Sequence, residues 1–378
     1  MTRILLDPEI FILQEFGGIS RYYTEIYSAL DCEPQVQIIC PILYTNNIHF
    51  KESSLFKKKH QTPLQFLMRN LKFSREFLSR KLRKRSKKRS KEQTISLLKK
   101  QDFEVYIPTY YDPYFLAYIQ DKPYILTVYD MIHELYPHYF LDDQYTVPHK
   151  KLLIEKAAKV IAISESTKRD ILKVYPHISP EKIEIVYLAH TIKTTSKTEI
   201  NVPENYILFV GNRSAYKNFT FFLKAISGIL KEKKDLFLLC AGGNTFNTDE
   251  IQLIDSLELT NQVIQRKFQD AELPAYYKKA NCFVFPSEYE GFGIPVLEAM
   301  ACSCPVVLAN HSSFPEVAGE AGVYFELSNA TDLKDKVKNL LDNIEIRKMY
   351  IQKGLEQAAK FNWKKTTDEC LKIYQSVS

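Results

Sequence analysis

The feature that most constrains the fold is an alternation along the whole chain. Short apolar runs rich in β-branched and aromatic residues are separated by longer helical patterns. Strands that alternate with helices are typical of parallel sheets covered by helices on both faces. The sequence therefore predicts an α/β protein. The predicted strands lie at 3–7, 36–40, 104–107, 124–128 and 160–163, and then at 206–211, 235–243, 281–286 and 304–310.

A polar segment rich in threonine divides the chain. The stretch HTIKTTSKTEINVPEN, at 190–205, has few apolar residues and is typical of an interdomain linker. A length of 378 residues also suits two domains of average size. The predicted division is a first domain, a linker, a second domain and a C-terminal helix, at 1–190, 191–205, 206–360 and 361–378.

The composition excludes several classes of protein. No apolar run approaches the roughly 20 residues that span a bilayer. The first residues are unlike a signal peptide, because Asp7 and Pro8 interrupt their apolar run, so we expect a cytoplasmic protein. The seven cysteines are scattered through apolar surroundings, which predicts reduced core residues. The close pair Cys302 and Cys304 lacks a second ligand pair, so we expect no zinc site.

Positive charge is concentrated in one segment. Between Arg69 and Lys91, twelve Lys or Arg residues face a single acid, Glu76. Three interpretations stand: a solvated charged face, a contact with anionic lipid headgroups, and nucleic-acid binding. No nucleic-acid-binding module accompanies the block, so we expect no nucleic acid and a contact with an anionic membrane surface through 64–91. Leucines recur there at a spacing that predicts an amphipathic helix, at Leu64, Leu67, Leu71, Leu78 and Leu82.

The stretch FPSEYEGFGIPVLEAM, at 285–300, combines three features of an anion-binding loop. A predicted strand ends at Phe285, and Gly291 and Gly293 let backbone amides approach a ligand. Pro295 then suits the first turn of a helix. The N-terminus of such a helix attracts a diphosphate, and open α/β sheets bind ligands at the carboxyl ends of their strands. We therefore predict a phosphate-bearing ligand here.

Two carboxylates flank this loop at the spacing Glu-x7-Glu, namely Glu290 and Glu298. An ionised carboxylate accepts hydrogen bonds from two neighbouring hydroxyls, so one glutamate can hold a hexose and the other a ribose. A general acid/base pair is one alternative. The other is a pair of ordinary acids at a helix start, where they suit the helix dipole. The surrounding strand, glycine turn and helix favour sugar binding.

Two cations four residues apart, Arg213 and Lys217, follow the predicted strand at 206–211. They can neutralise a leaving diphosphate, whose charge grows as the bond to the sugar breaks. The alternative for each is a surface cation. No Asp-x-Asp occurs in the chain, so the usual bridge through a divalent cation is not expected. We expect no metal and no cofactor.

The first domain adds two pairs of candidates. The segment LTVYDMIHELYP, at 126–137, follows a predicted strand and places Asp130 and His133 on a loop expected to face a cleft. A capping Asp and a packed His are the alternatives. Gly17 and Gly18, in GGISRY, are by themselves typical of a simple turn.

These segments resemble one family. SEYEGFGIPVLEAM resembles the signature of glycosyltransferase family 4, retaining enzymes of the GT-B fold, in which two Rossmann-like lobes face a central cleft with their parallel sheets. FVGNRSAYKN, at 209–218, resembles that family's phosphate-binding element, and GGISRY its first-lobe glycine loop. FNWKKTTDECLKIY, at 361–374, resembles the helix that crosses back to the first, acceptor-side lobe. The basic insertion, at about 50–100, falls outside the resemblance.

The resemblance implies roles for particular residues. Many family members carry His where this chain has Tyr129, so His133 is the substitute candidate. Glu290 would bind the donor sugar and Glu298 the ribose, while the leaving phosphate takes the acceptor proton and the anomeric configuration is retained. The implied catalytic residues are Asp130, His133 and Glu290. The implied donor-binding residues are Gly17, Gly18, Arg213, Lys217, Glu290, Gly291, Phe292, Gly293, Ile294 and Glu298.

The expected function follows from the resemblance. A hexose would move from a nucleotide sugar, with GDP-mannose favoured over a UDP-sugar, to a glycan or lipid-linked glycan in cell-surface polysaccharide or lipopolysaccharide synthesis. The protein would lie peripherally on the inner face of the plasma membrane. One alternative is a non-catalytic nucleotide-sugar-binding protein, against which intact Glu290 and Glu298 argue. Another is an epimerase or phosphorylase of the same fold.

Overall fold

The first lobe is built on six parallel strands in two sheets of three, ordered β2-β1-β3 and β4-β5-β6. A parallel bridge between Tyr106 and Tyr124 joins the two sheets. The computed structural model describes residues 1–42, 45–59, 75–194 and 198–378, with side chains omitted at 57–86. The strands are β1 (Thr2–Leu6), β2 (Val36–Ile39), β3 (Val105–Ile107), β4 (Ile125–Val128), β5 (Lys159–Ala162) and β6 (Ile183–Ile185).

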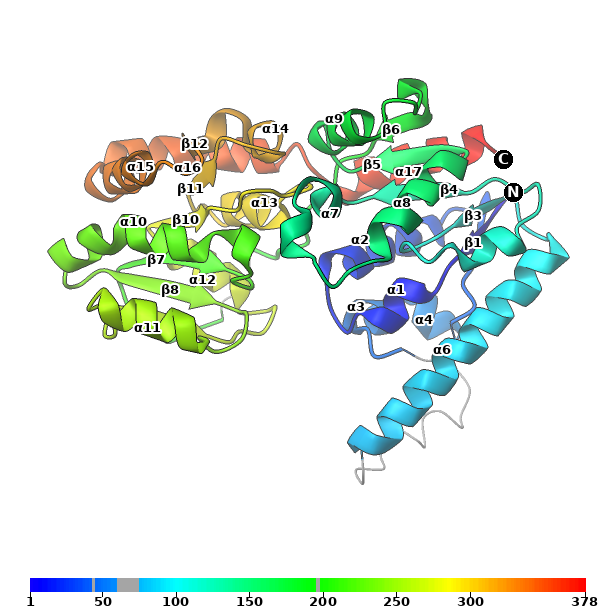
Figure 1. Cartoon of the computed structure of the whole chain (residues 1–378), viewed down its shortest axis with the longest axis horizontal. Coiled ribbons are helices and arrows are strands. Elements are labelled where there is room, and N and C mark those ends of the chain that lie inside the picture. Colours follow the sequence, from blue (N-terminus) through cyan, green and yellow to red (C-terminus); the bar gives the residue numbers. More distant parts are fainter. Residues whose placement is uncertain (43–44, 60–74, 195–197) are drawn as a thin grey trace.

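Helices cover both faces of these sheets (Figure 1). Most are amphipathic, with buried residues on one side, as helices packed on a sheet require. They are α1 (Glu9–Leu13), α2 (Gly18–Leu30), α3 (Ile48–Glu52), α4 (Ser54–Lys59), α6 (Arg75–Lys100), α7 (Ile132–Leu135), α8 (Thr146–Lys156) and α9 (Glu165–Val174), with 3-10 turns η1 (Pro113–Ala117), η2 (Pro137–Tyr139) and η3 (Pro180–Lys182).

The second lobe has one parallel sheet of six strands, ordered β12-β11-β10-β7-β8-β9. Its strands are β7 (Tyr206–Val210), β8 (Phe237–Ala241), β9 (Val263–Arg266), β10 (Cys282–Phe285), β11 (Val306–Ala309) and β12 (Gly322–Phe325). Its helices are α10 (Phe219–Glu232), α11 (Thr248–Ser256), α12 (Leu273–Lys279), α13 (Ile294–Ala301), α14 (Phe314–Ala318), α15 (Ala330–Asp342) and α16 (Ile344–Ala358), with turns η4 (Ala215–Lys217) and η5 (Gly319–Ala321).

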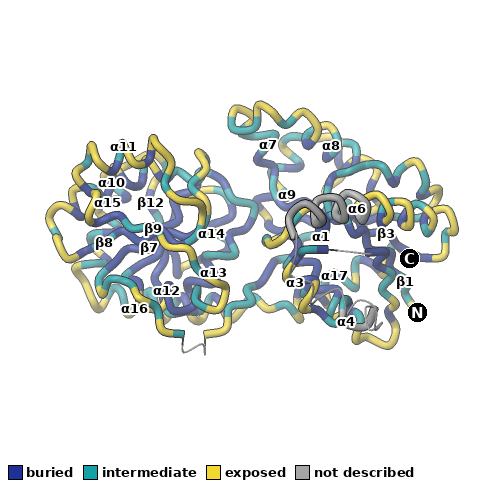
Figure 2. The backbone as a smooth tube through the Cα atoms, turned by 90° about the horizontal axis from the view of Figure 1, so that it is seen from below, coloured by how far each residue is buried: buried dark blue, intermediate teal, exposed yellow. Residues whose placement is uncertain are grey.

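The α/β class is confirmed, and every predicted strand exists in the structure. The sequence missed β6, β9 and β12, and all three lie at a sheet edge. Edge strands bury less of their surface, so their apolar pattern is weaker. Central strands such as β10, in contrast, are buried along their whole length. Figure 2 shows the buried backbone running through the interior of both lobes.

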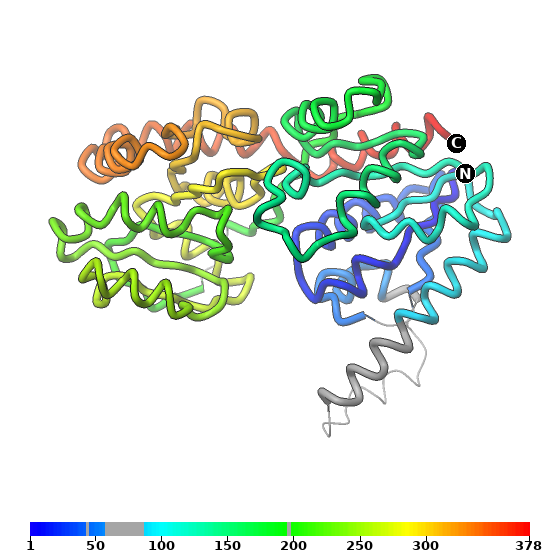
Figure 3. The backbone as a smooth tube through the Cα atoms, in the orientation of Figure 1, coloured from blue at the N-terminus to red at the C-terminus, as the bar shows by residue number. Residues whose placement is uncertain are grey.

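The chain returns to the first lobe at its C-terminus. Helix α17 (Trp363–Ser376) packs against α2, where the Tyr27 hydroxyl donates to that of Tyr374 at 3.0 Å. Figure 3 shows this last segment, in red, among the blue and green elements of the first lobe. All seven cysteines are free, as predicted, and six of them are buried; the prediction of a core position was wrong for Cys32, which is exposed.

Helix α6 contains most of the basic block. The predicted leucine stripe lies outside the described residues, either wholly or in its side chains. From Lys87 onward the helix has two faces: Ser90, Thr94 and Leu98 are fully buried, whereas the cations at 87–89 are exposed. Nowhere in the described ranges is a helix both long and apolar enough to cross a membrane.

Candidate active site

The glycine loop follows β10 and leads into α13, as predicted. Gly293 adopts a left-handed backbone, with φ of +100°, and Pro295 stands in the first turn of the helix. A Cβ atom on Gly293 would lie 3.3 Å from the Phe314 ring, so little room remains there for a side chain. A glycine is therefore needed at this turn. The turn leads directly into the start of α13, where the first N–H groups of a helix lack an α-helical partner.

Gly291 brings the two lobes into contact. A Cβ atom on this residue would lie 1.7 Å from the Tyr129 carbonyl oxygen and 3.1 Å from the Asp130 Cβ atom. The Thr167 hydroxyl, also in the first lobe, donates to the Gly291 carbonyl at 3.3 Å. Glycine is thus required for this approach of backbone to backbone, which places Asp130 beside the loop that carries Glu290.

Glu290 forms an ion pair with Lys217. The Lys217 Nζ and Glu290 Oε1 atoms are 2.5 Å apart, and both side chains are largely buried. Burial lowers the pKa of Lys217, but the charges of Glu290, Tyr216 and Asp130 outweigh it, so the net pKa is raised. Lys217 is therefore a permanent cation at neutral pH. The Ser312 hydroxyl donates to the Glu290 carbonyl and accepts from the Glu290 N–H, which holds the loop in place.

Glu298 is buried within the first turns of α13. The Tyr277 hydroxyl lies 3.4 Å from one of its oxygens, and Arg21 of the first lobe lies 3.6 Å from the other. Burial raises the pKa of Glu298, while the Arg21 charge opposes this rise. Arg21 also donates to Asp270 at 2.8 Å. Sequence reasoning missed Arg21 as a site residue, although it lies within the GGISRY motif.

The first glycine loop faces the second. Gly17 caps the start of α2, and a Cβ atom on Gly18 would lie 3.9 Å from the Ile294 Cδ1 atom. The N-termini of α2 and α13 therefore approach each other across the cleft, which favours a shared anionic ligand. Phe292 is buried and packs on the rings of Tyr187 and Phe361, so its side chain supports the loop.

Arg213 is held by a different carboxylate. Its Nε atom donates to Glu250 Oε1 at 2.6 Å, and its Nη2 atom donates to the carbonyls of Asn244 and Thr245. Glu250 also closes a capping box with Asn247 at the start of α11. Among the described residues, the buried Nη1 atom has no hydrogen-bond partner. Arg213 and Lys217, the two residues predicted to bind phosphate, therefore pair with different carboxylates. Phosphate binding by Arg213 stays a prediction.

Asp130 lies next to the N-cap residue of α7, which is Met131, so the predicted capping alternative does not hold at that position. Its carboxylate accepts from the Ile132 N–H at 3.2 Å, and its carbonyl accepts from the buried Lys150 amine at 3.0 Å. The Asp130 carboxylate remains partly exposed, and its charge contributes to the raised pKa of Lys217. Asp130 is therefore near enough to the Glu290 loop to contact a ligand held there.

His133 does not lie on a loop, so that part of the prediction was wrong. It is in α7, with its ring 4.0 Å from that of Phe140 and its Nε2 atom 3.4 Å from Asp143. Burial and the Lys150 charge lower its pKa, which favours the neutral imidazole. The loop ends early because α7 begins at Ile132, whose N–H donates to the Asp130 carboxylate. A catalytic role for His133 stays a prediction.

Tyr289 connects the lobes and was not predicted. Its hydroxyl donates to Asp170 at 2.7 Å and accepts from the Met131 N–H at 3.1 Å. Its position beside Glu290 in the quoted motif was the available signal. In the described ranges, no three His, Cys, Asp or Glu side chains are grouped as a metal ion would require. Metal independence stays a prediction.

Two family models divide the chain between them. Residues 16–189 match Glycosyltransferase Family 4, and residues 191–357 match Glycosyl transferases group 1. The chain belongs to glycosyltransferase family 4. Membership makes it a hexosyltransferase by class.

Three curated relatives of this family-4 chain are named as sugar transferases. O-antigen chain mannosyltransferase B of Escherichia coli is 26% identical over 290 residues, which are 73% of this chain and 75% of that protein. O-antigen chain mannosyltransferase RfbU of Salmonella typhimurium is 29% identical over 57% of this chain and 60% of its own length. A Campylobacter jejuni N-acetylgalactosaminyltransferase, whose named acceptor is a diphospho-undecaprenol glycan, is 30% identical over 58% and 61%. The matched region thus spans less than two thirds of the latter two relatives.

Solved structures confirm the GT-B fold. HepE of Anabaena, in a complex with UDP and glucose, superimposes over the full length of both chains with a TM-score of 0.71 and 16% identity. Sucrose-phosphate synthase of Thermosynechococcus elongatus covers 100% of this chain and 99% of its own, with a TM-score of 0.72 and 16% identity. Identities this low compare folds alone.

Proposed function

We propose that the chain transfers a hexose, with retention, from a nucleotide sugar to a lipid-linked glycan in the synthesis of a cell-surface polysaccharide such as O-antigen. The observation that carries this proposal is the convergence at Gly291. There the Glu290 loop of one lobe contacts the backbone at Tyr129 and Asp130 of the other. A sugar held by the loop would therefore meet groups from both lobes, as catalysis between two reactants requires.

The donor diphosphate would lie between the N-termini of α2 and α13. Lys217 supplies positive charge where the leaving diphosphate gains negative charge, so its stabilisation is greatest in the transition state. Glu290 already neutralises Lys217, and it would accept hydrogen bonds from the sugar hydroxyls. Glu298 would accept from the ribose. Arg213 would join the phosphate through its Nη1 atom, which has no partner among the described residues, while its Nε atom stays on Glu250.

In this proposal the donor diphosphate, and not a protein side chain, accepts the proton of the acceptor hydroxyl. In the proposed retaining reaction, the acceptor hydroxyl attacks the anomeric carbon on the face from which the diphosphate leaves, and a diphosphate oxygen takes the hydroxyl proton. Asp130 would orient the acceptor or the donor hydroxyls beside Gly291. The closed contact at Gly291 would keep water from the reacting carbon.

GDP-mannose is the favoured donor, because two of the named relatives are O-antigen mannosyltransferases. A UDP-sugar is the second candidate, supported by UDP in the HepE complex. Thermal-shift measurements with UDP, GDP, ADP and their sugars separate the two, since a ligand that binds only the folded state raises the melting temperature. GDP-mannose should give the largest shift. No shift with any nucleotide would contradict the proposal.

The acceptor and the membrane contact can be tested together. The Campylobacter relative is named for a diphospho-undecaprenol acceptor, which supports a lipid-linked acceptor here. Such a lipid lies in a membrane, and the exposed cations Lys87, Lys88 and Arg89 of α6 could contact its anionic surface. Replacing the three by Gln leaves the buried side of α6 intact.

The expected result is weaker retention on vesicles containing phosphatidylglycerol, by at least about tenfold. The matched control removes two exposed cations from α8, Lys151→Gln with Lys156→Gln. Equal retention of both variants and the native chain would contradict the membrane contact and would leave the transferase proposal standing.

A further inference from the structure

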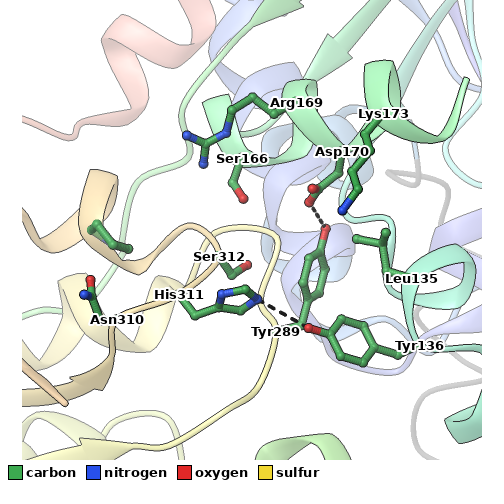
Figure 4. Close-up of a pocket in the computed structure, with 11 residues that line it drawn as sticks. Leu135, Tyr136, Ser166, Arg169, Asp170, Lys173, Tyr289, Asn310, His311 and Ser312 are labelled. Carbon is green, nitrogen blue, oxygen red and sulfur yellow. Dashed lines mark hydrogen bonds between the residues drawn. The ribbon is translucent and has the colours of Figure 1, made fainter. Parts of the chain in front are cut away.

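A second pocket lies between the lobes, on the other side of the Glu290 loop. Its volume is about 530 Å³, within the range of small-molecule sites. The first lobe lines it with one face of α9 and with the end of α7, and the second lobe lines it with Tyr289 and the loop after β11 (Figure 4). The pocket therefore exists only while the lobes stay together.

One face of α9 supplies two free cations. Ser166, Arg169, Asp170 and Lys173 follow a spacing of three and four residues, which places them on one side of the helix. Arg169 and Lys173 are exposed, and neither makes an ion pair or donates a hydrogen bond within the described part of the chain. The Cβ atoms of residues four apart on a helix lie about 5–6 Å from each other. In Figure 4 Arg169 extends away from Lys173, so the two long side chains must turn toward each other to hold one anion.

The other polar groups of the pocket suit an anion. The acid Asp170 accepts from Tyr289 at 2.7 Å, so this oxygen is already engaged. His311 lies across the pocket, with its Nε2 atom 3.3 Å from the Tyr136 hydroxyl. The buried Ser166 adds a hydroxyl on the α9 side. Among the lining groups that the structure describes, the cationic ends of Arg169 and Lys173 and the Ser166 hydroxyl make no hydrogen bond. The Asp170 carboxylate and the other lining hydroxyls, those of Tyr136, Tyr289 and Ser312, have partners.

We propose that Arg169 and Lys173, with Ser166 and His311, form a phosphate-binding subsite separate from that of the donor diphosphate. A phosphate fills only part of the volume, which leaves room for a further group on the ligand. The phosphate has two sources, a phosphorylated lipid acceptor or free phosphate, and the first of these rests on the proposed function. The shared chemistry is a tetrahedral anion held by an arginine and a lysine.

Two residues that line the pocket also form hydrogen bonds with the backbone at the proposed reaction centre. Ser312 exchanges hydrogen bonds with the backbone of Glu290, and Tyr289 accepts from the Met131 N–H next to Asp130. A phosphate that contacts both lobes would stabilise their closed arrangement by its differential affinity for it. Filling the subsite would therefore hold Glu290 and Asp130 together around the donor.

Calorimetry on the full chain tests the proposal with two probes, citronellyl diphosphate and inorganic phosphate. The double variant Arg169→Gln with Lys173→Gln should weaken citronellyl diphosphate binding by about tenfold or more, through the loss of two charge-assisted contacts. Both side chains are exposed and without partners, so the variant should fold. The control variant Lys151→Gln with Lys156→Gln removes the same charge from α8 and should bind like the native chain.

A Lys217→Gln variant separates this subsite from the donor site. It should retain the binding that the α9 double variant loses. Binding lost in Lys217→Gln and kept in the α9 variant would overturn the proposal, as would equal binding by the α9 and α8 variants or no binding by the native chain. If inorganic phosphate shows the same α9 dependence, free phosphate is the source; if only the prenyl diphosphate does, the acceptor is. Nucleotide thermal shifts report on the donor site independently.

Discussion

Arg213 and Lys217 follow the same strand, four residues apart, yet they belong to two different regions of the second lobe. Lys217 pairs with Glu290 in the loop that meets the first lobe, here called the Glu290 region together with Gly291. Arg213 pairs with Glu250 at the start of α11, here called the Glu250 region. Both pairs are largely buried. The two ion pairs thus have the same chemistry but different places. One lies at the cleft, and the other lies where α11 packs on the second lobe.

Replacing each cation by glutamine is the most direct test of whether the two ion pairs have different roles. Lys217→Gln should lower kcat/KM by about 100-fold to 1000-fold, because the charge that stabilises the leaving diphosphate is lost. Arg213→Gln should lower kcat/KM by less than about tenfold and act mainly on stability, by about 3–5 kcal/mol, because Glu250 would remain buried without its partner. Steady-state kinetics and urea unfolding measure the two effects. Equal losses of kcat/KM would show that Arg213 also binds the donor.

The contact between the lobes comes next in expected effect. Gly291→Ala places a methyl group against the Tyr129 carbonyl, so the lobes must separate and kcat/KM should fall by about 100-fold. Gly228→Ala is the control, since a Cβ atom there has no neighbour within 4 Å. It lies within α10 and should stabilise the fold by about 0.5–1 kcal/mol with activity retained. An active Gly291→Ala variant would contradict the interlobe contact as the basis of the site.

The ribose assignment of Glu298 predicts a smaller effect. Glu298→Gln keeps the shape of the side chain but loses a charged acceptor, so donor affinity should fall by about tenfold. Glu250→Gln, in the Glu250 region, should change donor affinity by less than about twofold, which is the size of an effect expected without direct contact. Calorimetric titration with the nucleotide sugar measures both. Unchanged affinity in Glu298→Gln would remove the ribose assignment.

Glu9 offers a carboxyl group with the opposite environment from that of Glu290. Burial and the nearby Asp7 charge raise the pKa of Glu9 from 4.5 to about 8. Because the pKa of Glu9 is raised on folding, this group contributes its full stabilisation below pH 4.5. That contribution is lost as the pH rises through 8. The native chain should therefore lose stability between these values, relative to Glu9→Gln, by up to about 1.4 kcal/mol per pH unit. Urea unfolding of both proteins at pH 5, 6.5 and 8.5 tests this, and parallel curves would contradict it.

Much of the site could be read from local pattern. The strand, glycine turn and proline of the 285–300 stretch form the loop that their spacing predicts, because these conformations depend on neighbouring residues. The central strands were equally clear. The resemblance to the family signature then predicted that this loop binds the donor. The structure departs from prediction at His133 and at the three edge strands. His133 lies in a helix of only four residues, too short for a helical period, and the edge strands are partly exposed.

The sequence by itself determined the α/β class, the glycine loops and the family. Only the tertiary structure decided that Glu290 pairs with Lys217, that Glu250 holds Arg213, and that Arg21 reaches Glu298 across the cleft. Backbone conformation and strand burial leave a local periodic record in the sequence. The partner of a charged side chain leaves none, because the packing of distant segments sets it. Two of these pairs join segments 37 and 73 residues apart within the second lobe, and the third joins the two lobes.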